Sequence, residues 1–328
     1  MNKLSDLGER KAIEFISKIV SKGKVAVGIG DDCAAFEFGN KYLLVTTDMI
    51  SEKTHIPKTM KPWQIGWFTV AVNLSDISAK GGKPLGILLT LGLPKDTSES
   101  FLKELVKGAD KCATQFGTAI VGGDTKETSE IMLSGTAFGT VQKDEFMSRK
   151  GAKPGDIIAV TGSLGKAAAG YYALEHNIKN KETLKGILEP VPRISEGVAL
   201  AKTEVVTSSM DISDGLSSSL YQLQELNKVG FQIDKRKIPL SKALLKFQGK
   251  KDINIYEHAI HFGGDYELLV TLPSGEFNNA QKILMKLGTT LTTIGRVTKE
   301  KKISIVDGKT KQILKNKGYE HFRKHALF

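Results

Sequence analysis

Apolar residues recur along this chain with two spacings, one typical of amphipathic helices and one typical of strands. Helices are predicted over residues 7–20, 62–81, 99–116, from 164, from 194, up to 227 and over 277–287. Strands are predicted over 42–47, 85–91, 119–121, 131–141, 157–161, 206–210, near 231, and over 268–272, 293–297 and 303–313. Helices and strands alternate in both halves of the chain, which predicts an α/β (α+β) protein with two layers in each half.

A polar, basic and turn-rich segment, residues 148–156, interrupts this alternation near the middle of the chain. Exposed segments of this composition are typical of domain boundaries, and 328 residues are enough for two hydrophobic cores. The boundary is therefore predicted just before the segment, giving domains of residues 1–145 and 146–328.

Composition points to a protein of the cytoplasm. Hydrophobic residues make up 40% of the chain, but no run of about 18 apolar residues predicts a membrane span. The first residues lack the basic flank and apolar core of a secretory signal. Cys33 and Cys112 have no metal-binding spacing and are expected to be free thiols. We therefore expect a cytoplasmic protein with no membrane partner.

The net charge of +11 allows three interpretations. Lysines are spread along the whole chain, and no nucleic-acid-binding motif accompanies them, so no nucleic acid partner is expected. A basic field also attracts phosphorylated small molecules. The interpretation that we favour is a solvated, lysine-rich surface.

Five acidic segments share one design, in which an Asp at a strand end or turn adjoins glycine or a small hydroxyl residue. They are residues 28–32, 46–48, 73–76, 122–125 and 211–215. Each alone is explained by helix capping or turn formation. If the fold gathers them, their carboxylates would repel one another without a cation, and Mg²⁺ prefers such oxygen ligands. Magnesium that keeps several waters usually also binds phosphate, so a nucleotide is the expected partner.

Two glycine motifs for nucleotide binding are incomplete. Residues 162–167 resemble a phosphate-binding loop but are too short and lack the hydroxyl residue after Lys166. Gly28-Ile29-Gly30 begins a dinucleotide fingerprint, but Cys33 stands where the third glycine belongs.

Seven segments, in order, resemble the thiamine-monophosphate kinase family of the aminoimidazole ribonucleotide synthetase superfamily. They are residues 28–32, 46–48, 71–79, 122–125, 148–156, 211–216 and 263–268. The resemblance implies a two-domain aminoimidazole ribonucleotide synthetase-like fold and a homodimer whose N-terminal domains pair into a β-barrel. It also implies that residues 1–145 bind ATP and magnesium and form the dimer, while residues 146–328 complete the site.

The resemblance further implies ATP-dependent phosphorylation of thiamine monophosphate to thiamine diphosphate. We predict direct in-line transfer of the γ-phosphate, because the chain has many Asp ligands and no motif for an activated nucleophile. The implied magnesium ligands are Asp32, Thr46, Thr47, Asp48, Asp76, Asp124, Asp211 and Asp214. The implied ATP contacts are Gly123, Asp124, Arg149 and Ser213. The implied acceptor contacts are His55, Gly264, Asp265 and Asn316. The transfer would rest on Asp32, Asp76, Asp124, Arg149 and Asp214.

Two positions depart from the family pattern, and both lie on the acceptor side. Gly264 replaces a glutamate that contacts substrate in the family, and Asn316 replaces an aromatic residue. Two alternatives therefore stay open: an enzyme of the same superfamily that acts on another acceptor, and a non-catalytic ATP-binding module.

Overall fold

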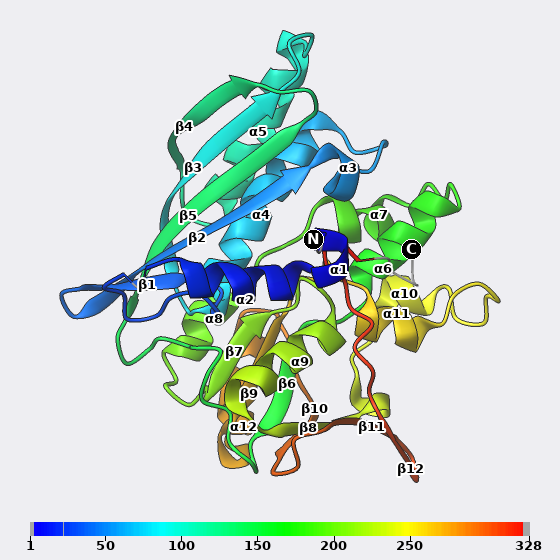
Figure 1. The fold of residues 1–328 in the computed structure, drawn as a ribbon. Coiled ribbons are helices and arrows are strands. Elements are labelled where there is room, and N and C mark those ends of the chain that lie inside the picture. The colour runs from blue at the N-terminus through cyan, green and yellow to red at the C-terminus, as the bar shows by residue number, and fades with distance from the viewer. Residues whose placement is uncertain (1–2, 22, 324–328) are drawn as a thin grey trace.

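The computed structural model describes residues 3–21 and 23–323, which fold into two domains around two mixed sheets (Figure 1). The helices are α1 (Leu4–Leu7), α2 (Glu9–Ile19), α3 (Glu52–His55), α4 (Pro62–Ala79), α5 (Glu99–Gln115), α6 (Lys166–Glu175), α7 (Lys181–Leu188), α8 (Ile194–Ala201), α9 (Leu216–Asn227), α10 (Lys242–Leu245), α11 (Ile255–His261) and α12 (Phe277–Lys286). Within the part that the structure describes, no helix is both long and apolar enough to cross a membrane.

The N-terminal sheet has the strand order β1-β2-β5-β3-β4. Its strands are β1 (Ala34–Phe38), β2 (Lys41–Ser51), β3 (Lys83–Leu93), β4 (Ile120–Glu127) and β5 (Met132–Gln142). Helices α4 and α5 lie together behind this sheet in Figure 1, and no helix of the described residues lies across the front of β3, β4 and β5. The buried alternate residues of the strands, such as Ile87, Leu89 and Leu133, join the helices in one core.

Helix α4 is apolar on nearly all sides, as expected for a helix enclosed by protein. It begins with Pro62 at its first position, where the missing N–H costs no hydrogen bond. Two glycines let α4 and α5 approach closely. A Cβ on Gly66 would lie 1.9 Å from the Leu105 carbonyl oxygen, and one on Gly108 would lie 1.8 Å from the Trp63 carbonyl oxygen. Only glycine fits these two positions.

The C-terminal sheet has the strand order β12-β11-β8-β10-β6-β9-β7. Its strands are β6 (Ile157–Thr161), β7 (Ser208–Asp211), β8 (Gly230–Asp234), β9 (Leu268–Leu272), β10 (Leu291–Thr298), β11 (Ile303–Asp307) and β12 (Thr310–Ile313). One core joins the sheet to α6, α9 and α11, and another joins it to α8 and α12. Along β6, Ile158 and Val160 enter the first core and Ala159 enters the second, so both sheet faces are buried.

Most predicted elements are confirmed, but two predicted strand ends are wrong. Thr46, Thr47 and Asp48 lie inside β2, and Gly123 and Asp124 lie inside β4. The predicted opening helix is two helices, separated at Gly8 with φ 76°. The pattern also missed β1 and the short helices α3, α7, α10 and α11. Cys33 and Cys112 are free and buried, as expected.

Candidate active site

Three carboxylates from both domains form the centre of the site. Asp32 precedes β1, Asp76 lies in the last turns of α4, and Asp211 ends β7. One oxygen of each lies within 4.8 Å of the others. Thr46 Oγ1 donates to Asp76 Oδ2 at 2.5 Å, and Ser75 Oγ donates to Asp211 Oδ2 at 2.6 Å. These hydroxyls orient the carboxylates without neutralising them.

The surroundings of this cluster disfavour negative charge. Burial, together with Asp48 and Asp211, raises the pKa of Asp76 well above its usual range. Burial and the charge of Asp32 raise the pKa of Asp211 to about 7. The pKa values of two flanking carboxylates are raised as well. Burial and the charges of Asp32 and Glu9 raise the pKa of Asp48 to about 6. Burial and the charge of Glu9 raise the pKa of Asp214 to about 7. Carboxylates placed in this way ionise fully only when cations are close.

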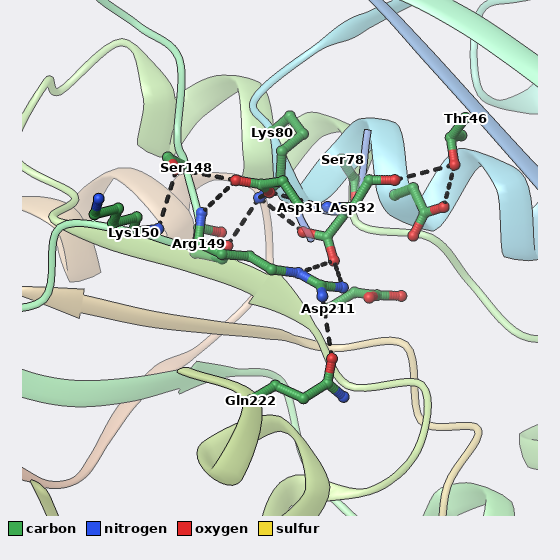
Figure 2. Close-up of polar contacts among 12 residues, drawn as sticks. Asp31, Asp32, Thr46, Ser78, Lys80, Ser148, Arg149, Lys150, Asp211 and Gln222 are labelled. Carbon is green, nitrogen blue, oxygen red and sulfur yellow. Dashed lines mark hydrogen bonds and ion pairs between the residues drawn. The ribbon is translucent and has the colours of Figure 1, made fainter. Parts of the chain in front are cut away.

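Two basic side chains lie at one edge of the cluster (Figure 2). Arg149 donates through Nε to Asp32 Oδ1 at 2.7 Å, and its Nη2 contacts the same oxygen. Arg149 Nη1 also donates to Gln222 Oε1 at 3.1 Å. Lys80 Nζ lies 2.7 Å from Asp32 Oδ2. Asp32 is therefore held between two cations.

The expected ligands from the N-terminal sheet lie on two different faces. Thr46 is buried on the helix-covered face, where it reaches Asp76. Thr47 Oγ1 donates instead to the Gly135 carbonyl oxygen at 2.8 Å, on the open face. The exposed Asp124 pairs in register with Thr90, which also points to the open face. The side chains of Thr47 and Asp124 are thus not gathered with the central carboxylates.

The turn of residues 211–215 brings two further segments of the chain together. Gly264 N donates to the Ser213 carbonyl oxygen at 2.6 Å, and Tyr319 N donates to the Asp214 carbonyl oxygen at 3.0 Å. Ser213 and Gly264, expected on the ATP and acceptor sides, are therefore neighbours. Gly264 has φ 89°, and a Cβ there would meet Ala167 Cβ at 3.2 Å.

The other three residues expected to contact the acceptor, His55, Asp265 and Asn316, lie in different surroundings. The His55 ring lies 5.3 Å from that of His321, which joins α3 to the C-terminal segment. Burial, with His321, lowers the pKa of His55 to about 4, which keeps it neutral at pH 7. Asp265 accepts from Gly165 N at 2.5 Å and Ala167 N at 3.1 Å, so its carboxylate caps α6. The exposed Asn316 accepts from Gly318 N at 3.1 Å.

Three residues of the site were not singled out from the sequence. Lys80 precedes Gly81-Gly82 and reads as an ordinary surface lysine at a helix end, yet its side chain is fully buried. Asp31 precedes the expected ligand Asp32 and accepts from Lys80 at 2.5 Å. Tyr319 follows Asn316 by three residues and is bound through its N–H to the Asp214 carbonyl oxygen. Sequence spacing carries no signal for Lys80 because its partners are distant in the chain.

Family models match both domains. The model for AIR synthase related protein, N-terminal domain, matches residues 30–141, and that for the C-terminal domain matches residues 153–308. The thiamine-monophosphate kinase of Methanospirillum hungatei is 39% identical over 96% of this chain and 99% of its own length. That of Pyrococcus horikoshii is 35% identical over 90% of this chain and 91% of its own length.

Solved structures agree with these matches. AaThiL complexed with AMPPCP and TMP is similar with a TM-score of 0.87 and 30% identity, over 98% of this chain and 99% of that one. E. coli HypE, a hydrogenase maturation protein, has a TM-score of 0.71 at 18% identity, which shows a shared fold alone. The chain therefore belongs to the thiamine-monophosphate kinase family, within the AIR synthase related proteins.

Proposed function

We propose that this chain transfers the γ-phosphoryl group of ATP to the phosphate of thiamine monophosphate, giving thiamine diphosphate and ADP. The observation that carries the proposal is the cluster of Asp32, Asp76 and Asp211, built from both domains. Its relatives bear the name of this kinase, and the similar AaThiL was solved with AMPPCP and TMP.

The donor set fits magnesium. Asp32, Asp76 and Asp211 supply carboxylate oxygens, and Thr46 adds a hydroxyl, the hard ligands that Mg²⁺ prefers. The raised pKa values of Asp76 and Asp211 indicate carboxylates that lack sufficient positive charge. We infer that Asp48 and Asp214, at the rim, complete the set. Magnesium held there would neutralise phosphate charge and help to align the two substrates.

For ATP we propose Arg149 and Ser213 beside the cluster, with Gly123 and Asp124 on β4. Arg149 carries a planar guanidinium suited to phosphate oxygens. Asp124 and Thr47 point to the open sheet face, so we propose that they join the metal and nucleotide site from there. The nucleotide would then lie close to the dimer contact.

For the acceptor we propose His55 and the segment at Gly264. Asp265 is proposed to act indirectly, because its carboxylate caps α6 and so holds Gly264 in place. Tyr319 is a better candidate than Asn316 for the contact near the C-terminus. Tyr319 is bound to the Asp214 backbone, whereas the Asn316 side chain caps its own turn.

The transfer needs no catalytic base. A phosphate monoester with second pKa about 6 is mostly dianionic at neutral pH, so its oxygen attacks the γ-phosphorus directly and ADP leaves. The obstacle is repulsion between anions, about 4 kcal/mol for a unit pair at ~4 Å and an effective dielectric near 20. Arg149 offsets part of this repulsion and orients the phosphates.

The open face of the N-terminal sheet supports the proposed homodimer and its barrel. Phe36, Met49, Leu88 and Val121 come from four strands and are 39–56% exposed on or beside this face. An apolar surface of this kind is typical of a protein–protein contact. We propose that two such sheets face each other, pairing residues 1–145 of two chains, while residues 146–328 complete each site.

The test is ATP turnover by the purified protein with and without thiamine monophosphate. We expect ADP and thiamine diphosphate in equal amounts, formed only when both substrates and Mg²⁺ are present. Turnover with a different phosphorylated acceptor from a small panel would favour another enzyme of the superfamily. ATP binding without turnover on any acceptor would favour a non-catalytic module.

Direct transfer has its own test. With γ-³²P-labelled ATP, a chase during turnover is expected to leave no label bound covalently to the denatured protein. Label trapped on the protein at levels that account for the turnover rate would exclude direct transfer.

A further inference from the structure

Lys80 is a lysine whose side chain is completely enclosed at the junction of the two domains. It follows α4, and its Nζ lies 2.5 Å from Asp31 Oδ1, 2.7 Å from Asp32 Oδ2 and 2.9 Å from the Ser209 carbonyl oxygen. An ammonium group has three N–H donors, and here three oxygens surround it. With three acceptors around its three donors, the ammonium form of Lys80 is the form that fits this enclosure.

Asp31 connects this cation to the turn that carries Arg149. Its Oδ2 accepts from Ser148 Oγ and from Arg149 N, both at 2.9 Å. Lys80, from the N-terminal domain, thus fixes the start of the C-terminal domain through one carboxylate (Figure 2).

Asp32 is shared between Lys80 and Arg149, and the two cations differ in access. The Arg149 side chain is 17% exposed, whereas that of Lys80 is 0% exposed. A nucleotide phosphate can therefore reach Arg149 and draw it from Asp32. No ligand can reach Lys80, which stays on Asp32 throughout.

We propose that Lys80 is a resident cation of the active site, a positioning residue that holds Asp32 and the Ser148–Arg149 turn in place before metal or nucleotide binds. This inference rests on the proposed function only for the identity of the substrates. An ordinary buried ion pair would stabilise the fold alone. A resident cation also determines how well the cluster binds a divalent ion.

The test uses the variants Lys80→Met, Asp31→Asn and the combination of both. Lys80→Met alone leaves Asp31 without its cation, so it is used only to report folding. The double variant removes one positive and one negative charge, so the net charge of the site is kept. What it loses is the fixed position of Asp32.

Binding of Mn²⁺ to the nucleotide-free protein is measured by calorimetry, with circular dichroism to confirm folding. We expect the double variant to bind Mn²⁺ about tenfold more weakly than the wild type. We also expect a lower kcat and an unchanged KM for thiamine monophosphate. Lys166→Met is the matched control, because Lys166 pairs with buried Glu267 outside the acidic cluster. It is expected to lower the thermal midpoint and leave Mn²⁺ affinity unchanged.

Wild-type Mn²⁺ affinity in a folded double variant would overturn the inference. If the double variant does not fold, Lys80→Gln with Asp31→Asn carries the test, because it also keeps the net charge of the site: weaker Mn²⁺ binding supports the inference, and wild-type affinity overturns it. A wild-type protein that binds no Mn²⁺ would overturn both proposals. Failure of the thiamine monophosphate assay alone overturns the proposed function and leaves the Lys80 comparison intact.

Discussion

Asp76 shows how a single residue connects helix, sheet and site. It lies half-buried in α4, accepts from Thr46 of β2, and has an oxygen within 4.8 Å of those of Asp32 and Asp211. Its raised pKa indicates that, without a cation, its negative charge opposes folding. The same residue is therefore unfavourable for the metal-free fold and favourable for binding a metal ion.

Asp76→Asn keeps the shape of this side chain and removes its charge. We expect kcat to fall by more than about 100-fold, because even the partners behind metal ligands contribute 10–100-fold. The thermal midpoint in EDTA should be unchanged or higher, since the amide does not repel Asp211. Kinetics at saturating Mg²⁺ check the first expectation, and near-normal activity would contradict the metal assignment.

His261 predicts a pH dependence of stability. Its side chain is 2% exposed, its Nδ1 lies 2.7 Å from Ser217 Oγ, and burial lowers its pKa to about 4 despite the nearby Glu257. Between pH 6.5 and 4 the unfolded chain therefore binds more protons at this residue than the folded chain. Its contribution is fully present above pH 6.5 and is lost as the pH falls towards 4.

The comparison with His261→Gln isolates this effect. Each pH unit of acidification in that window lowers the free energy of unfolding by up to about 1.4 kcal/mol for one histidine. Between pH 7.5 and 5.5 the wild type should therefore lose about 1 kcal/mol more stability than the variant. Urea unfolding at both pH values measures the difference. Equal losses in the two proteins would show that the pKa of His261 is the same in the folded and unfolded chain, which would contradict the lowered pKa.

At the scale of elements, α4, α5 and β6 were predicted well because their signals are local: α4 has Pro62 in its first turn and glycines after its end, α5 has one apolar face, and β6 is a short continuous apolar run. The pattern of apolar residues misread two glycine- and threonine-rich segments as strand ends. Glycine serves in turns and also where strands approach closely, and the sequence alone does not separate these uses. The same limit applies to Thr46 and Thr47, whose opposite directions follow from the strand's pleat.

Gly123 gives a test of this second use of glycine. A Cβ there would lie 1.7 Å from the Leu89 carbonyl oxygen of β3, whereas one on Gly122 would meet only Leu88 Cδ2 at 3.2 Å. The two glycines have similar φ values, 154° and 159°, so they differ mainly in space. Gly123→Ala is expected to destabilise the protein by roughly 1–3 kcal/mol and to raise the KM for ATP.

Gly122→Ala is the matched control and should change both quantities much less. Differential scanning calorimetry and ATP titrations measure them. Equal melting temperatures for the two variants would mean that β4 shifts at no cost, which would contradict the close approach of β3 and β4.

At the scale of the molecule, the order of the acidic segments in the sequence indicated one site, and the two domains do bring Asp32, Asp76 and Asp211 together. The sequence could not show that Asp124 and Thr47 lie on the other sheet face, because that depends on strand register. It also could not show Lys80, whose role depends on three segments that are distant in the chain. The net charge of the chain, +11, has the sign that attracts anionic substrates.

The open face of the N-terminal sheet is predicted to form the dimer contact, because a monomer would leave its apolar side chains in water. The wild type is expected to have twice the 35.7 kDa mass of one chain by sedimentation velocity. Leu88→Glu with Val121→Glu places two charges on the face and should give the single-chain mass, since buried like charges oppose association. Met285→Glu is the control, because Met285 is 61% exposed on α12, far from this sheet in the fold, and should leave the dimer intact.

If the nucleotide lies near the contact, the monomeric variant should also have a raised KM for ATP while its secondary structure, by circular dichroism, is unchanged. A wild type that sediments as one chain, or a double variant that stays dimeric, would exclude this face as the dimer contact.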